Sequence, residues 1–76
     1  MKAIIQYWFV RPNARGRRMV EYKVIGRKDN IVGKAQDHIS EWLSHDNYIH
    51  AAKIKVKIVD HYGRPETSWQ YSPTYR

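Results

Sequence analysis

The chain has 76 residues, of which 42% are hydrophobic, and its formal net charge is +7. This length is typical of one small domain with a thin core and a small margin of stability. The absence of cysteine excludes a disulfide framework and a thiolate zinc site. No apolar run approaches the ~20 residues of a membrane span, and the first ten residues lack the pattern of a signal peptide. We therefore expect a cytoplasmic protein with no membrane partner.

The positive charge is concentrated in one part of the chain. Residues 11–28 contain seven Lys or Arg and one Glu, whereas residues 30–48 contain one Lys and three acidic residues. A polarised basic surface attracts polyanions over about a Debye length, roughly 8 Å in physiological salt. Nucleic acid is the commonest such partner, followed by an anionic membrane surface or an acidic protein. A surplus of basic residues that serves solubility alone is the alternative.

The first predicted element is a strand over Lys2 to Val10, because this segment is rich in β-branched and aromatic residues. Its nearly continuous apolarity is typical of a central strand. The segment RPNARGRR at 11–18 contains turn-forming Pro, Asn and Gly and predicts a hairpin loop. Apolar and polar residues then alternate over Met19 to Ile25, which predicts the second strand.

A single helix is predicted over Asn30 to His45, with Asp29 or Asn30 as its cap. Its apolar side chains fall on one arc of about 120° at 100° per residue. These are Ile31, Val32, Ala35, Ile39, Trp42 and Leu43. We expect Ile39 and Trp42 to pack on the sheet and Asp37 and Ser40 to face water.

The third strand is predicted over Ala52 to Asp60, where basic and apolar residues alternate. Lys53, Lys55 and Lys57 belong to one face, and Ile54, Val56 and Ile58 belong to the other. The segment 66–76 contains Trp69, Tyr71 and Tyr75. It is either a short edge strand or an arm, with its aromatic residues folded over the core or exposed to a protein partner.

These elements predict a single small α+β domain over residues 1–65, with 66–76 as a C-terminal arm or short fourth strand. The order β-β-α-β most simply gives a mainly antiparallel three-stranded sheet, ordered 2-1-3, packed on one helix with a right-handed crossover. On the central strand, Ile5, Tyr7 and Phe9 are expected to face the helix. The outward set is then Ile4, Gln6, Trp8 and Val10.

The open sheet face is the first candidate site. It is expected to carry Lys23, Lys53, Lys55 and Lys57, with Trp8 between the Lys23 and Lys55 rows. An aromatic ring among cations suits single-stranded nucleic acid, because bases stack on the ring and ammonium groups meet phosphates. Two alternatives remain open. In the first alternative, Trp8 belongs to the core and the lysines only protect an edge strand. In the second, the apolar outward residues form a homodimer contact.

The hairpin loop is the second candidate site, with Arg11, Arg15, Arg17 and Arg18 among eight residues. Arginine pairs bidentately with phosphate and with guanine edges, and a two-stranded ribbon fits the DNA major groove. A loop without any partner is the alternative.

The remaining polar clusters favour neither a metal site nor catalysis. His38, Glu41 and His45 share a helix flank but supply only three ligands, and no nucleophile accompanies them. We therefore expect no enzymatic activity, no metal site and no cofactor. The sequence predicts a small basic nucleic-acid-binding protein, for DNA or RNA. The alternative is a small interaction module or inhibitor, of the kind frequent among phage and mobile-element accessory proteins, that docks on a host protein or complex.

Overall fold

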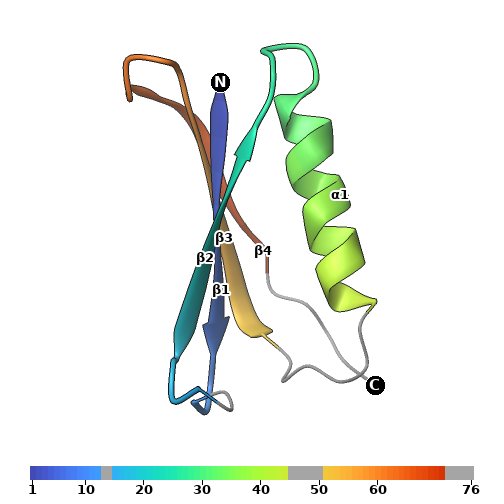
Figure 1. Cartoon of the computed structure of the whole chain (residues 1–76), viewed down its shortest axis with the longest axis vertical. Coiled ribbons are helices and arrows are strands. Elements are labelled where there is room, and N and C mark those ends of the chain that lie inside the picture. Colours follow the sequence, from blue (N-terminus) through green and yellow to red (C-terminus); the bar gives the residue numbers. More distant parts are fainter. Residues whose placement is uncertain (13–14, 45–50, 72–76) are drawn as a thin grey trace.

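The computed structural model describes residues 1–12, 15–44 and 51–71. These residues form β1 (Lys2–Phe9), β2 (Met19–Ile25), α1 (Ile31–Leu43), β3 (Ala51–Val59) and β4 (Pro65–Tyr71). The strands make one antiparallel sheet in the order β2-β1-β3-β4, and α1 covers one of its faces (Figure 1). The predicted α+β class and the 2-1-3 order are confirmed, and β4 joins the sheet beside β3.

β1 is a central strand because its side chains have partners on both sides. Ala3, Ile5 and Tyr7 alternate with partly exposed residues and are fully buried under α1. Each of them lies opposite an apolar residue of β2 and another of β3; Ile5, for example, lies between Tyr22 and Val56. The period of two expected from the sequence therefore divides this strand between a buried and an open face.

β3, the strand in which lysines alternate with aliphatic residues, folds as predicted. Ile54, Val56 and Ile58 are at most 1% exposed, whereas Lys55 and Lys57 are exposed and Lys53 is half-buried. Burial of each aliphatic side chain contributes about 1.5–3 kcal/mol, so this strand supplies a large part of the core. The strand begins and ends one residue earlier than expected.

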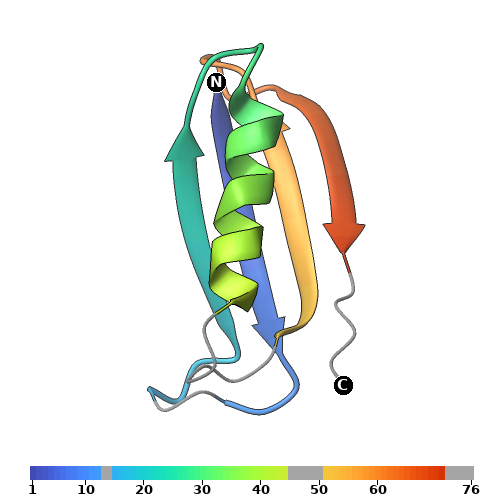
Figure 2. The same ribbon diagram turned by 90° about the vertical axis from the view of Figure 1, so that its right-hand side faces the viewer.

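The helix packs through a row of residues spaced by four, which lie above one another on its surface. Ile31, Ala35 and Ile39 are buried, and Trp42 and Leu43 are partly buried against the same core. The prediction that Val32 faces the core is wrong: it is 41% exposed, because it lies about 100° from this row. Figure 2 shows α1 lying across β1 and its two neighbours, with β4 beyond the helix.

Asp37 and Ser40 are exposed, as expected. Asn30 precedes the helix, but its side-chain oxygen accepts a hydrogen bond from the backbone N–H of Arg27 at 2.8 Å. It therefore stabilises the β2–α1 turn and gives the helix no side-chain cap. The helix ends at Leu43, and the predicted last residue, His45, lies outside the described residues.

An aromatic cluster joins the helix to β1 and β2. Trp42 stacks on Tyr7 with ring centroids 4.3 Å apart, and Tyr22 meets Tyr7 edge-on at 5.8 Å. The Tyr7 hydroxyl lies 2.7 Å from Nδ1 of His38. Burial raises the pKa of Tyr7 far above its usual value, with a smaller contribution from Tyr22. Burial also lowers the pKa of His38, against the opposing effect of Glu41.

β1 ends one residue earlier than the sequence indicates. The backbone N–H of Phe9 donates to the carbonyl oxygen of Arg18 at 2.8 Å, and the register with β3 shifts between Trp8 and Phe9. Val10 follows the strand and is 72% exposed. Pro12 comes two residues later and has no N–H with which to continue a ladder. Val10 therefore does not belong to the outward face of β1, contrary to the prediction.

The segment from Pro65 forms the edge strand that was one of the two alternatives. Its residues are mostly polar and exposed, and it begins with proline, both of which are typical of a protected sheet edge. Trp69 lies opposite Val56 and packs against the core, whereas Tyr71 is 45% exposed. Tyr75 lies outside the described residues.

In the part of the chain that the structure describes, α1 is too short and too polar to cross a membrane, and no other helix is present.

Candidate functional site

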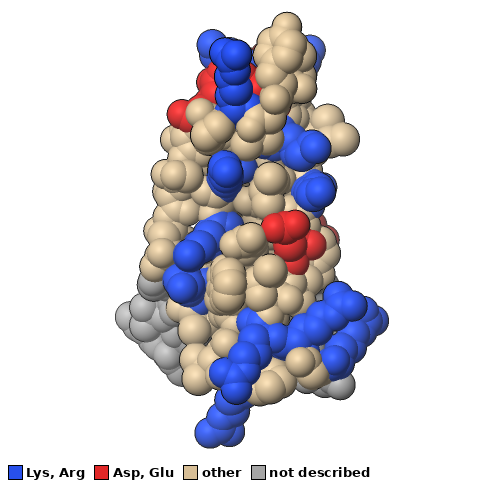
Figure 3. Space-filling model, turned by 90° about the vertical axis from the view of Figure 1, so that its left-hand side faces the viewer, with Lys and Arg blue, Asp and Glu red and all other residues tan. Residues whose placement is uncertain are grey.

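The sheet face opposite α1 is strongly basic, and we call it the lysine face. The strand registers place five lysines on it: Lys2 of β1, Lys23 of β2, and Lys53, Lys55 and Lys57 of β3. Glu21 is the sole acidic residue of these three strands, and it belongs to the same face. Figure 3 shows basic side chains along this face and few acidic ones among them.

The spacing of these lysines follows from the sheet. Alternate residues on one strand lie about 6.6 Å apart, and neighbouring strands lie about 4.8 Å apart. Lys23 and Lys57 flank Ile4 across β1, so their backbones are about 10 Å apart. The ammonium groups therefore form a band several ångströms wide instead of a single line.

Trp8 lies on the lysine face and not in the core, which settles one of the alternatives above. The Nζ atoms of Lys53 and Lys55 are 5.2 and 5.4 Å from its ring centroid, within the range of cation–π attraction. As predicted, Trp8 lies on β1 between the strands that carry Lys23 and Lys55, but neither lysine is the residue paired with it. Trp8 lies between Met19 and Lys53, whereas Lys23 lies opposite Ile4, about 13 Å further along β1.

A hydrogen-bonded chain of side chains crosses from Trp8 to β2. The indole N–H of Trp8 donates to Oε1 of Gln6 at 3.2 Å, and Nε2 of Gln6 donates to Oε1 of Glu21 at 2.9 Å. The two ends of the Gln6 amide thus have different partners, which fixes its orientation. Gln6 in turn holds the Glu21 carboxylate beside the middle of β1.

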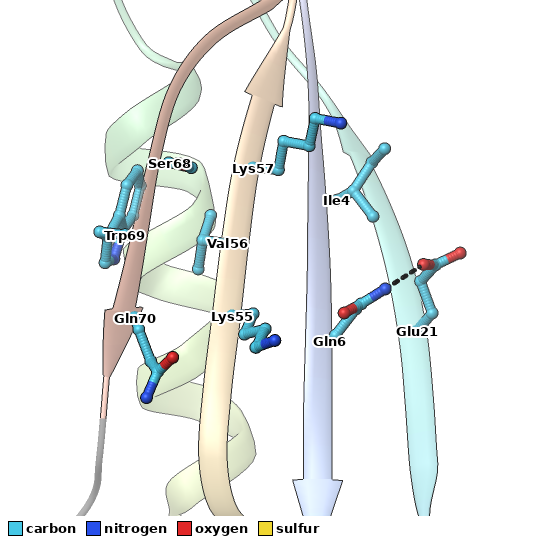
Figure 4. A pocket seen from close by; sticks show the side chains of 9 residues that line it. All are labelled: Ile4, Gln6, Glu21, Lys55, Val56, Lys57, Ser68, Trp69 and Gln70. Carbon is cyan, nitrogen blue, oxygen red and sulfur yellow. Dashed lines mark hydrogen bonds between the residues drawn. The ribbon is translucent and has the colours of Figure 1, made fainter.

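An open depression of about 550 Å³ lies on the lysine face between β2 and β4. Its polar lining comes from Gln6, Glu21, Lys55, Lys57, Ser68 and Gln70, and Ile4 adds an apolar side chain. Figure 4 shows the side chains of Val56 and Trp69 on the helix side of the sheet. These two residues therefore border the depression mainly with their backbone.

The arginine loop, residues 11–18, continues the lysine face at the end where Trp8 lies. Arg11, Arg15, Arg17 and Arg18 are all exposed, and Gly16 has a φ of 75°, which favours glycine. Trp8 is paired with Met19, so the loop leaves and re-enters the sheet close to the indole ring. Figure 3 shows basic side chains gathered at this hairpin end.

Several residues of this surface were missed by sequence reasoning. Lys2 carries a signal, because it is in phase with Gln6 and Trp8 on the same strand. Glu21 was recognised as a polar strand position but not as part of a site. Ser68 and Gln70 carry no signal, since their place depends on β4 pairing with β3.

The structure does not show a site formed by the three helix-flank residues His38, Glu41 and His45. His38 contacts Tyr7 and also packs on Tyr22 with ring centroids 4.9 Å apart, and His45 lies outside the described residues. Within the described ranges no group of three or more His, Cys, Asp or Glu is arranged to hold a metal ion. His38 is thus explained by packing and by its hydrogen bond.

Comparison with family models, with curated proteins and with solved structures finds no match for this chain. Its chemistry must therefore be inferred from the geometry of its surfaces.

Proposed function

We propose that this protein binds nucleic acid, without catalysing a reaction on it, through the lysine face and the arginine loop. The observation that carries the proposal is the placement of five lysines and one carboxylate on a single sheet face that also presents an indole ring. Phosphates bound there release their counterions, which gives affinity with little sequence dependence. We place this activity in the cytoplasm.

Single-stranded nucleic acid fits this face better than duplex does. A sheet face with a half-buried aromatic ring and a polar depression offers unpaired bases a surface for stacking and hydrogen bonding. Lys53 and Lys55 cover the Trp8 ring, and their flexible side chains can turn from the ring to the phosphates when a base stacks. The arginine loop adds cations at the hairpin end of the same surface.

A homodimer through this face is disfavoured by its charge. Two copies that met there would bring two sets of five lysines together, and like charges at close range repel. Val10 lies beyond the strand, so Ile4 and Trp8 are what remains of the proposed apolar contact. Ile4 lies between Lys23 and Lys57, and Trp8 lies beside Lys53. An acidic protein would satisfy the same charges, and the experiment below distinguishes it from nucleic acid.

The test is a fluorescence-polarisation titration of labelled single-stranded and duplex oligonucleotides at low salt. One variant replaces Lys23, Lys53, Lys55 and Lys57 by Gln. The matched control replaces four exposed basic residues of the turns and the helix by Gln: Arg27, Lys28, Lys34 and Arg64. Both variants lose four positive charges, and circular dichroism checks that both are folded.

The variant that lacks the four lysines, which we call the face variant, is expected to bind more than 10-fold more weakly than the wild type. The control is expected to bind about 2- to 3-fold more weakly, through the change in net charge alone. Equal losses in the two variants would contradict the assignment of the lysine face. Absence of binding by the wild type to DNA and RNA at low salt would overturn nucleic acid as the partner and leave an acidic protein as the partner to test.

A further inference from the structure

We propose that the depression on the lysine face holds one unpaired nucleobase and that Glu21 makes it selective for guanine. This inference rests on the proposed function and adds to it a residue that determines specificity. It concerns one base of the bound strand, whereas the lysines act on the phosphates of any sequence.

The lining of the depression has two chemically different parts. Lys55 and Lys57 supply cations for phosphate or carbonyl oxygens, and Glu21 supplies the sole carboxylate among the described residues of the lining. Gln6, Ser68 and Gln70 add groups that both donate and accept hydrogen bonds. A volume of about 550 Å³ is within the usual ~300–1,000 Å³ of small-molecule sites.

The Glu21 carboxylate is oriented by hydrogen bonds within the protein itself. The hydrogen bond from Gln6 holds Oε1, and Gln6 is itself held by Trp8. In the described part of the chain, Glu21 forms no ion pair with the lysines around it. An ionised carboxylate accepts up to four hydrogen bonds, so Glu21 retains acceptor sites for a ligand.

Guanine is the base whose edge best fits a carboxylate. It presents two adjacent donors, the ring N1–H and the N2 amino group, and charge-assisted pairs of this kind are strong and directional. Cytosine and adenine present an amino group beside a ring-nitrogen acceptor, and the single N–H of uracil or thymine lies between two carbonyl oxygens. The carboxylate of Glu21 repels these acceptor atoms. The O6 atom of guanine, in contrast, accepts a hydrogen bond from a nearby ammonium group.

The experiment compares single-stranded ten-nucleotide probes that differ at one central position. In an all-uridine background the central base is uridine, cytidine, adenosine, guanosine or inosine, and a thymidine background carries the same series as DNA. We expect the wild type to bind the guanosine probe about 10-fold or more tightly than the uridine probe. Inosine lacks the 2-amino group and is expected to lose most of this preference.

The decisive variant is Glu21→Gln, with Asp37→Asn on the exposed face of α1 as the matched change of charge. Glu21→Gln is expected to bring the guanosine-to-uridine ratio to within about 2-fold while leaving uridine binding equal or tighter, because one negative charge is removed. Asp37→Asn should keep the wild-type ratio.

The outcomes separate the two proposals. Equal wild-type affinity for all five probes overturns the guanine site and leaves the lysine face in place. A guanine preference that persists in Glu21→Gln also overturns the role of Glu21. Failure of every probe to bind at low salt overturns the proposed function itself.

Discussion

Trp8→Ala tests whether the indole ring of the lysine face contributes to binding. Stacking of one base on an aromatic side chain is worth about 1–3 kcal/mol. The Nζ atoms of Lys53 and Lys55 already lie 5.2 and 5.4 Å from the centroid of the Trp8 ring. Each exposed cation–π contact of this kind is worth about 0.5–1 kcal/mol. A stacking base displaces these contacts, so we expect the lower end of the stacking range, about 1 kcal/mol, which corresponds to roughly a 5-fold change in affinity.

We therefore expect Trp8→Ala to weaken single-strand binding about 5-fold and to leave duplex binding nearly unchanged, measured by polarisation at a fixed salt concentration. Trp8→Phe is the matched control, because it keeps an aromatic face, and it should stay within about 2-fold of the wild type. Equal losses on single strands and duplex, or no loss on either, would show that the ring is not a stacking site.

Three further changes test the fold that supports this face. Val56→Asp should unfold the domain, because an unpaired buried charge costs several kcal/mol against a small margin; a folded variant by circular dichroism would contradict the assignment of β3. Tyr7→Phe removes only the hydroxyl that meets His38 and should lower the free energy of unfolding by about 1 kcal/mol in urea titrations; an unchanged midpoint would contradict a stabilising role for this bond. Since burial lowers the pKa of His38 in the fold, the unfolded chain binds its proton more readily, and stability should fall as the pH drops through about 6.5 and should level off below the pKa of the folded state. His38→Gln should reduce this dependence, and a pH profile identical to that of the wild type would contradict it.

The elements of this fold could be predicted because hydrophobic patterns report local periodicity directly. The alternation from Lys53 to Ile58 indicates a strand with one buried face, and the structure buries that apolar face. The spacing of Ile31, Ala35 and Ile39 indicates the helix and its packed side.

What the sequence could not provide depends on pairing between strands. The register alone decides that Met19 and Lys53 lie beside Trp8, while Lys23 lies beside Ile4. The depression was not foreseeable either, because β4 must pair with β3 before it can form one wall. Val10 was misplaced because its apolarity continues the pattern of β1 past the last hydrogen bond of the hairpin.

The salt dependence of oligonucleotide binding tests the central claim most directly. On single strands, each phosphate neutralised by a lysine contributes about −0.7 to the slope of log affinity against log salt, so four contacts give about −2.8. We predict that replacing Lys23, Lys53, Lys55 and Lys57 by Gln makes the slope less steep by about this amount. The control variant in the turns and the helix should keep the wild-type slope. A slope that is unchanged in the face variant, or a wild-type affinity that does not respond to salt, would contradict nucleic-acid binding by the lysine face.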